Sequence, residues 1–265
     1  MNKKGIGLLA AIVVLGAASL ASAQEATPPP GKDESLKKIV RVAQNFSLSV
    51  AEKALKLETA PVLRWPNPTR ETPDGATFIW TLDGRPLAIG CVWQYVKGNV
   101  GFEFHSLSQS PIQATRGDEV IWKCEKRGIT LEPFPDAPVP AKTAVTRAKQ
   151  MRDLARRFNC RVHAQGKEDL RLLTQPLYVW DRNGDKLPDL ALFAFVQGTD
   201  PEVILLLETA EGAKGQEWRY ALTRRSGVAL EADLDGKKVW SVPGSLGARD
   251  EPWLHGGLPG PGDRE

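Results

Sequence analysis

The sequence contains few of the residues that most often carry catalysis or bind metals. It has three histidines and three cysteines among 265 residues. Cys91, Cys124 and Cys160 allow at most one disulfide, and no CxxC spacing supports zinc binding or thioredoxin-type redox chemistry. We expect a disulfide between Cys91 and Cys124, because both lie in strand-like segments of the same part of the chain. No GxSxG, HExxH, P-loop or GxGxxG motif is present, so the commonest hydrolase and nucleotide-binding classes have no support.

The sequence also lacks an excess of either charge. Lys and Arg together number 35, against 32 Asp and Glu, and removal of Lys3 and Lys4 with a signal peptide leaves 33 basic and 32 acidic residues. A net charge near +1 argues against nucleic acid or an anionic membrane as the main partner.

Long apolar runs are absent after the first 23 residues. Lys3 and Lys4 precede the apolar stretch 5–20, and Ala21-Ser22-Ala23 forms a small-residue cleavage site before Gln24. A membrane anchor is the alternative, but the stretch is short for a membrane span and rich in Ala and Gly. We therefore expect a signal peptide over 1–23, and a secreted or periplasmic mature protein with no membrane insertion after signal cleavage.

What the sequence does contain is an internal repeat. Residues 57–89 and 172–204 align at an offset of 115 without gaps, and ordinary composition would give about two identities over such a window. A fixed repeat usually means that one structural unit is used twice. The ten identical pairs are Leu57/Leu172, Thr59/Thr174, Pro61/Pro176, Trp65/Trp180, Pro73/Pro188, Asp74/Asp189, Ala76/Ala191, Phe78/Phe193, Pro86/Pro201 and Ile89/Ile204.

A helix precedes each copy of the repeat. Apolar residues recur at helical spacing at Leu36, Ile39, Val40, Ala43, Phe46 and Val50, and again at Met151, Leu154, Ala155 and Phe158. An offset of 112 aligns the two runs. The first helix is expected to begin near Leu36, capped by Asp33 or Ser35.

Short strands follow each helix. Ala76, Phe78 and Trp80 alternate on one face of a strand, as Ala191, Phe193 and Phe195 do in the second copy. The second of these strands is apolar on both faces, which predicts a central or interface position. Asp83-Gly84 predicts a hairpin turn. One further residue of shift places 102–104 over 218–220, and each copy ends on a strand with a tryptophan, over 119–123 and 237–241.

These patterns predict an α+β protein of two tandem units, each with one helix and about four antiparallel strands. We expect a disordered lead-in over 24–34, units over 35–130 and 143–242, a Pro-rich connector over 131–142, and a disordered tail over 243–265. The two units are expected to pack together. A single domain with a chance internal similarity is the alternative.

Residues 181–191, which read DRNGDKLPDLA, resemble the calcium loops of the FG-GAP and VCBS families. The resemblance implies that Asp181, Asn183, Asp185 and Asp189 offer oxygens to Ca²⁺. Lys186 departs from the family pattern, in which glycine occupies the sharp turn. A polar turn between strands is the alternative. Ca²⁺ is the one cofactor that the sequence suggests.

Glu103 and His105 fall on one face of a predicted strand, and such a pair can form a general base. Ser106, the nearest nucleophile, falls on the opposite face, so no catalytic residue is assigned. Of the eight tryptophans, Trp65, Trp122, Trp180 and Trp240 occupy matched repeat positions, which favours core packing over a ligand-binding platform.

Three segments carry a resemblance over most of residues 36–242: 65–68 (WPNP), 103–108 (EFHSLS) and 195–202 (FVQGTDPE). The chain resembles a group of exported bacterial proteins typical of planctomycetes, which implies export and no particular activity. The sequence therefore predicts an exported, non-enzymatic binding or structural protein. Its partner would be a protein, a peptide or an envelope polymer, held at the surface between the two units. The alternatives are a hydrolase-like enzyme with a site between the units and a calcium-stabilised module.

Overall fold

The computed structural model describes residues 32–259 except 97, 165 and 214, so the predicted signal peptide (1–23) lies outside the described residues. The first half of the chain comprises α1 (Lys32–Gln44), β1 (Phe46–Val50), β2 (Lys53–Ala54), β3 (Lys56–Asn67), the 3₁₀ turn η1 (Pro68–Arg70), β4 (Thr72–Leu82), β5 (Arg85–Gln94), β6 (Val100–Ser106), β7 (Ile112–Arg116) and β8 (Glu119–Cys124). The second half follows the linking strand β9 (Glu132–Pro133) and comprises α2 (Ala144–Ala155), β10 (Phe158–His163), β11 (Lys167–Asp169), β12 (Arg171–Leu172), β13 (Tyr178–Trp180), β14 (Leu190–Gln197), β15 (Asp200–Gly212), β16 (Gly215–Arg224), β17 (Ala229–Leu234) and β18 (Lys237–Val242). A last strand, β19 (Trp253–Leu258), ends the described chain.

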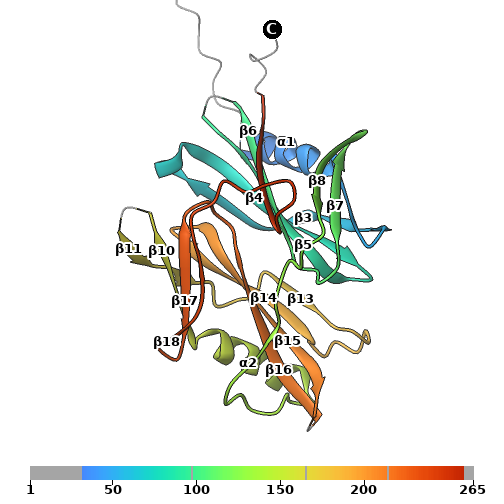
Figure 1. The fold of residues 1–265 in the computed structure, drawn as a ribbon, viewed down its shortest axis with the longest axis vertical. Helices are drawn as coiled ribbons and strands as arrows, with labels where there is room; N and C mark the ends of the chain where they lie inside the picture. Colours follow the sequence, from blue (N-terminus) through green and yellow to red (C-terminus); the bar gives the residue numbers. More distant parts are fainter. Residues whose placement is uncertain (1–31, 97, 165, 214, 260–265) are drawn as a thin grey trace, which may run out of the picture. The chain divides into compact units, whose positions relative to one another are not determined.

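The strands form four antiparallel sheets, two from each half (Figure 1). The smaller sheets have the orders β2-β1-β7-β8 and β11-β10-β17-β18. The larger sheets have the orders β19-β6-β5-β4-β3 and β12-β14-β15-β16-β9, and β13 also pairs with β14. The protein is thus mostly antiparallel sheet with two α-helices in the described residues, which makes it an α+β or mainly β structure, and the predicted α+β class is confirmed to that extent. The prediction of about four strands per unit was too low.

The two halves pair their strands in the same register. Phe78 lies opposite Gly90, and Phe193 lies opposite Leu205, so both partners follow the offset of 115. The bulge after Trp80 recurs after Phe195. Both Phe78 and Phe193 are fully buried, each in the core of its own half.

The relation continues to the end of each half at a different offset. On the last sheet strands, Trp122 lies opposite Ala114 and Trp240 opposite Ala232, and both pairs precede a bulge. The offset there is 118. Strands β6 and β16 share it, because Phe102 pairs with Val92 and Tyr220 pairs with Leu207. The predicted shift of one residue, which placed 102–104 over 218–220, was therefore wrong by two positions. The error preserved the faces of the strand, because side chains alternate with a period of two.

The first helix ends earlier than its apolar spacing predicted. Helix α1 stops at Gln44, and Phe46 and Val50 belong to β1 instead. Phe46, Leu48 and Val50 are buried while Ser47 is exposed, which is the alternation of a strand. Two apolar residues four apart satisfy the helical and the strand period alike, so the spacing alone could not place the boundary.

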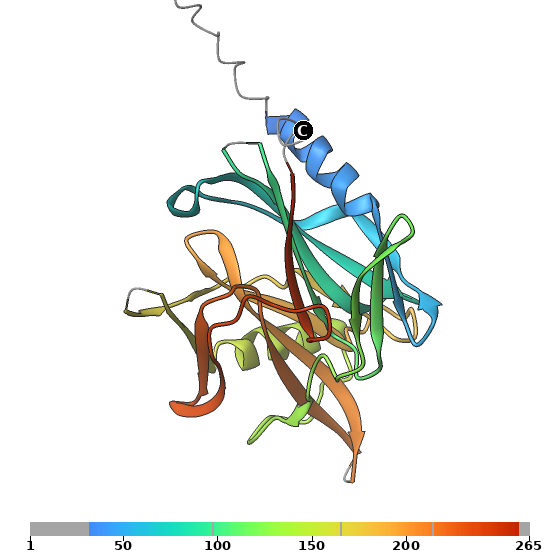
Figure 2. The ribbon, with the colours of Figure 1, turned by 45° about the horizontal axis from the view of Figure 1, so that its top comes forward.

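The two halves exchange edge strands. Strand β9, which follows the first half, pairs with β16 of the second half, and β19, which follows the second half, pairs with β6 of the first. Figure 2 shows the dark red chain of β19 among the strands of the first half. The prediction of a disordered tail over 243–265 is wrong for residues 253–258. Glycine and proline predicted a tail, but Gly256 and Gly257 pair with Phe102 and Gly101 in the sheet.

The three largest apolar clusters of the described residues hold these layers together. One lies between α1, the smaller sheet of the first half and one face of its larger sheet, and a second is its counterpart around α2. The third, which we call the interface core, joins the two larger sheets face to face, as the apolar second strand predicted. Its buried members are Ile79, Ile89, Leu107, Ile129, Leu190, Leu192, Ala194, Val196, Ile204, Leu206 and Ala221.

Candidate binding site between the two halves

The interface core gives way to a buried charged cluster where β6 meets the end of β16. Arg225, which is fully buried, places Nη2 2.9 Å from Oε1 of Glu103. Its Nη1 donates to the carbonyl of Ile89 at 3.2 Å, and the indole of Trp253 donates to the other Glu103 oxygen at 3.1 Å. Burial raises the pKa of Glu103 to about 7, and the attraction of Arg225 opposes that rise.

Two more carboxylates of the second half enter this cluster from the hairpin between β14 and β15. Asn67 donates to Asp200 at 2.8 Å, and Arg70 lies 3.5 Å from Asp200 and 2.9 Å from Glu202. Burial raises the pKa of Asp200 to about 7 and also raises that of Glu202. Three acidic groups and two arginines thus link the halves through side chains far apart in the sequence.

A small cavity of about 110 Å³ adjoins the charged cluster. Trp65, Trp93, Tyr95 and His255 give it aromatic walls, and Glu103, Asp200 and Arg225 give it charged ones. Its volume suits a few water molecules, which the buried polar groups around it can bind.

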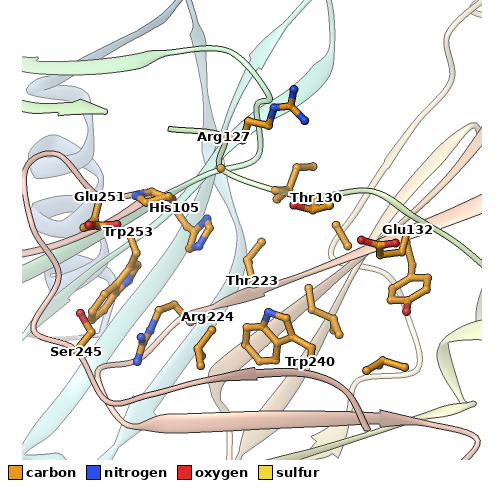
Figure 3. Close-up of a pocket in the computed structure, with 18 of the residues that line it drawn as sticks. His105, Arg127, Thr130, Glu132, Thr223, Arg224, Trp240, Ser245, Glu251 and Trp253 are labelled. Carbon is orange, nitrogen blue, oxygen red and sulfur yellow. The ribbon is translucent and has the colours of Figure 1, made fainter. Parts of the chain in front are cut away.

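A larger pocket of about 510 Å³ lies where the chain crosses between the halves. Figure 3 shows it bordered by β6, β16 and β18 and by the two links that lead to the exchanged strands. Its lining includes His105, Arg127, Ile129, Glu132, Thr223, Arg224, Val239, Trp240, Glu251 and Trp253. A concave, largely apolar site with a few polar groups is the usual form of a ligand-binding pocket.

His105 presents a hydrogen-bond acceptor to this pocket. Its Nδ1 lies 2.9 Å from the carbonyl of Ser106, and a carbonyl only accepts, so Nδ1 carries the proton. Burial lowers the pKa of His105 to about 3, which keeps the ring neutral at physiological pH. The neutral ring has one N–H, so Nε2 has a free lone pair, and among the described residues no donor meets it.

Trp240, Arg127 and Thr223 line the pocket with hydrogen-bond donors that have no partner among the described residues. Trp240 is half-buried, and its indole nitrogen lies on the side of the ring that faces Thr223 and His105 in Figure 3. Within the described chain, no acceptor meets that nitrogen and no carboxylate pairs with Arg127. Arg224 lies with its guanidinium 4.7 Å from the ring centre of Trp253 and donates to the carbonyls of Ser226, Val228 and Pro243.

The structure places the predicted calcium residues in the loop before β14. Asp189 is buried, lies 3.2 Å from Arg147, and accepts hydrogen bonds from Thr209 and from the amide of Arg182. Asp181, Asn183 and Asp185 lie in the more exposed part of the loop, and Asp185 accepts from the amide of Leu187 at 2.9 Å. Lys186 adopts a φ of 64°, so the lysine does occupy the sharp turn where the calcium families have glycine. No group of three or more acidic, cysteine or histidine side chains suited to a metal occurs in the described part of the chain.

The predicted pair Glu103 and His105 does share a face of β6, and both residues are buried. Each side chain has another partner, however. Glu103 binds Arg225 and Trp253, whereas His105 binds the carbonyl of Ser106. The hydroxyl of Ser106 accepts from the amide of Ser108 at 3.2 Å. The three residues therefore do not form the hydrogen-bonded chain of nucleophile, base and orienting acid that nucleophilic catalysis uses.

The predicted disulfide between Cys91 and Cys124 is wrong. All three cysteines are free and buried. The alternation of β5 turns Cys91 toward the interface, beside Thr77 and Trp65, whereas Cys124 belongs to the core beneath α1 on the other side of the sheet. Strand-like surroundings placed both residues in the same half but could not show that they face opposite ways.

Sequence reasoning missed Arg70, Arg225 and Asp200. Their partners are 130 or more positions away for Arg70 and Asp200, and 122 away for Arg225, so no local spacing signals the cluster. The one available signal was the charged pair Arg224-Arg225 at the end of a strand.

Comparisons with known proteins add no identity. No family model, no curated protein and no solved structure matches this chain. Among the described residues, no helix has the length and apolar character needed to cross a bilayer.

Proposed function

We propose that this chain is an exported, non-enzymatic binding protein that holds part of a protein, a peptide or an envelope polymer in the pocket between its two halves. The observation that carries the proposal is the pocket of about 510 Å³, with the unpartnered indole N–H of Trp240 and the acceptor nitrogen of His105 in its lining. Polar groups without partners in an apolar pocket gain most from a ligand that supplies the missing hydrogen bonds.

Binding can be tested with purified mature protein and two matched variants. Val239→Asp puts a charge into the apolar wall of the pocket, and Val145→Asp makes the same change on α2, outside the pocket lining and 82% exposed. Panels of envelope glycans, peptides and aromatic fragments should include a ligand that binds wild type and Val145→Asp alike but not Val239→Asp. If every ligand that binds wild type also binds both variants equally well, the binding site lies elsewhere.

The enzymatic alternative makes a different prediction. A hydrolase with its site between the halves would turn over substrates in a broad panel, and His105→Gln would abolish that turnover. Such a result would overturn the non-enzymatic proposal. It is disfavoured because His105, Glu103 and Ser106 each bind a different partner.

Export is proposed from the cleavage pattern at Ala21-Ser22-Ala23 and from the likeness to exported planctomycete-type proteins. N-terminal sequencing of protein recovered outside the cytoplasm should read from Gln24. An uncleaved, cell-associated chain would contradict the proposal.

We also propose that the two halves descend from one duplicated unit. Matched strand orders, matched registers at offsets 115 and 118, and bulges at matched positions support it. Trp65 and Trp180 keep the same register, opposite Gly75 and Leu190, but Trp65 is buried while Trp180 is half-buried. The duplication would be refuted by an experimental structure in which Phe78 and Phe193 occupy different positions after β4 is superposed on β14.

Calcium stabilisation stays a separate proposal, resting on the loop around Asp181. A Ca²⁺ site there would have to compete with Arg147 for the carboxylate of Asp189. If Ca²⁺ binds, millimolar Ca²⁺ should raise the melting temperature relative to chelator, and Asp181→Asn should remove the rise. An unchanged melting curve would end the idea.

A further inference from the structure

We propose that the pocket beside Trp240 binds an acidic peptide turn of a partner protein, with a main-chain carbonyl on the indole N–H of Trp240 and a carboxylate beside Arg127. The inference rests on the proposed binding function and names the chemistry of its ligand.

The first step is the equivalence of β8 and β18. Both are the last strand of a four-stranded sheet, and Trp122 and Trp240 occupy the same register in them. The two indoles should therefore stand at corresponding places beside β6 and β16.

The second step is that the place beside Trp122 is filled by the chain itself. The indole of Trp122 donates to the carbonyl of Glu251 at 2.8 Å, and the amide of Lys123 donates to the carbonyl of Arg249 at 2.8 Å. The carboxylate of Glu251 pairs with Lys126, and Trp122 is fully buried. Residues 249–252, which we call the covering segment, thus cover β8 as a turn of net negative charge, in which the amide of Glu251 donates to the carbonyl of Ala248.

The third step is that the corresponding place in the second half is open. Trp240 is only half-buried, and among the described residues neither its indole nor the amide of Ser241, which corresponds to Lys123, meets an acceptor outside the sheet. Strand β18 is the edge of its sheet, so its outer main-chain groups are available for pairing.

The length of the links explains the difference. Glu132 pairs with Tyr220 eight positions after Cys124, whereas Gly256 pairs with Phe102, the equivalent of Tyr220, fourteen positions after Val242. The second link is therefore six residues longer, and it supplies the covering segment. The shorter link has no residues to spare for Trp240, and the uncovered volume is part of the pocket.

Charge favours an acidic occupant. Arg127 lines the pocket and has no carboxylate partner in the described chain. Arg224 also lines the pocket, and its guanidinium donates hydrogen bonds to main-chain carbonyls and to no carboxylate of the described residues. Lys237 adds positive charge along β18. Two acidic residues, Glu132 and Glu251, also line the pocket, and Glu251 is already paired with Lys126. A carboxylate near Arg127 would repeat the pairing of Glu251 with Lys126 in the filled groove.

The covering segment supplies the probe for the test. The peptide Gly-Ala-Arg-Asp-Glu-Pro-Trp-Leu copies residues 247–254 and is added to mature protein that carries 5-fluorotryptophan. In ¹⁹F NMR, we expect the Trp240 resonance to shift and saturate, while the Trp122 resonance does not move. Replacement of the peptide's Glu by Gln should weaken binding several-fold, and the all-D peptide should not bind.

Two matched variants control the test. Trp240→Phe keeps an aromatic ring without the N–H and should weaken peptide binding about tenfold. Trp180→Phe removes an indole N–H from another half-buried tryptophan, outside the pocket lining, and should leave peptide affinity unchanged.

The outcomes separate the two proposals. If neither the copied peptide nor an array of acidic peptides shifts Trp240 while envelope glycans or aromatic fragments do, the peptide inference is overturned and the binding function stands. If no class of ligand shifts Trp240, both are overturned.

Discussion

The buried pair of Glu103 and Arg225 makes a prediction whose size and pH dependence both follow from the structure. Arg225→Met removes the guanidinium that lies 2.9 Å from a carboxylate with almost no solvent exposure. Removing one partner of a buried ion pair costs about 3–5 kcal/mol, because it leaves a charge without compensation. We expect a loss of this size at pH 8.

At pH 5 the same variant should lose less. Burial raises the folded-state pKa of Glu103 to about 7, above its unfolded value. Protonation of Glu103 therefore stabilises the fold. This stabilisation is fully present below the unfolded pKa and is lost as the pH rises toward 7. At pH 5 the carboxyl is already protonated and does not need Arg225. The remaining loss, about 1–2 kcal/mol, reflects packing and the hydrogen bond to Ile89.

Urea unfolding, followed by tryptophan fluorescence, measures both values. The double variant Glu103→Gln/Arg225→Met keeps an acceptor for the Trp253 indole but buries no charge at these two positions, and it should recover most of the loss at pH 8. A loss below about 1 kcal/mol at pH 8, or equal losses at both pH values, would refute the reasoning.

Three further predictions follow from other parts of the molecule. The folded-state pKa of Asp200 is raised to about 7, so the stability that protonated Asp200 contributes at pH 5 is lost as the pH rises to 8. The side chain of Asp200→Asn does not ionise, so in urea unfolding this variant should gain about 2 kcal/mol relative to wild type over that interval. A constant difference between the two proteins would contradict this. Trp122→Phe removes a buried hydrogen bond to Glu251 and should cost about 1–3 kcal/mol, whereas Trp240→Phe should cost under about 1 kcal/mol; equal costs would show that both indoles are satisfied alike. The three buried cysteines, with thiol pKa values raised by burial (Cys91 to about 11), should react with Ellman's reagent only after denaturation and then give three thiols per chain, and fewer would indicate a disulfide.

The sequence was most informative where side chains meet the same environment twice. Phe78 and Phe193 each fill the core of one half, so the same requirement acted at both positions and the offset of 115 was visible. The turn at Asp83-Gly84 was also predictable, because both residues adopt the positive φ that such a hairpin needs. Local geometry and repeated burial leave signals that one sequence can show.

The exchanged strands and the charged cluster left no such signal. Gly256 and Gly257 look like a flexible tail, and their place in a sheet depends on β6, about 150 positions earlier. The partners of Arg225 and Asp200 are similarly remote. Contacts of this kind arise only when the halves have folded against each other, so composition and periodicity cannot predict them.

The pocket residues show why a repeated sequence did not give a repeated site. His105 corresponds to Thr223, and both line the one pocket instead of two equivalent ones. Because the exchanged links run beside these residues, any difference in link length changes the surroundings of one copy only. The repeat therefore predicted the scaffold of the site but not its contents.

The charged cluster itself follows from the same asymmetry. The amide of Arg225 donates to the carbonyl of Glu202, and at the matching place the amide of Leu107 donates to the carbonyl of Leu87. Arg225 and Glu103 thus correspond to Leu107 and Ala221, which lie in the interface core. One side of the interface is apolar where the other is ionic, although the backbone contacts are equivalent.

An apolar pair would suffice to hold the two sheets together, as Leu107 and Ala221 do, and buried ion pairs contribute little net stability. The ion pair instead favours the pairing of unlike halves, since two copies of the first half would set Glu103 against Leu107 and two copies of the second would set Arg225 against Ala221.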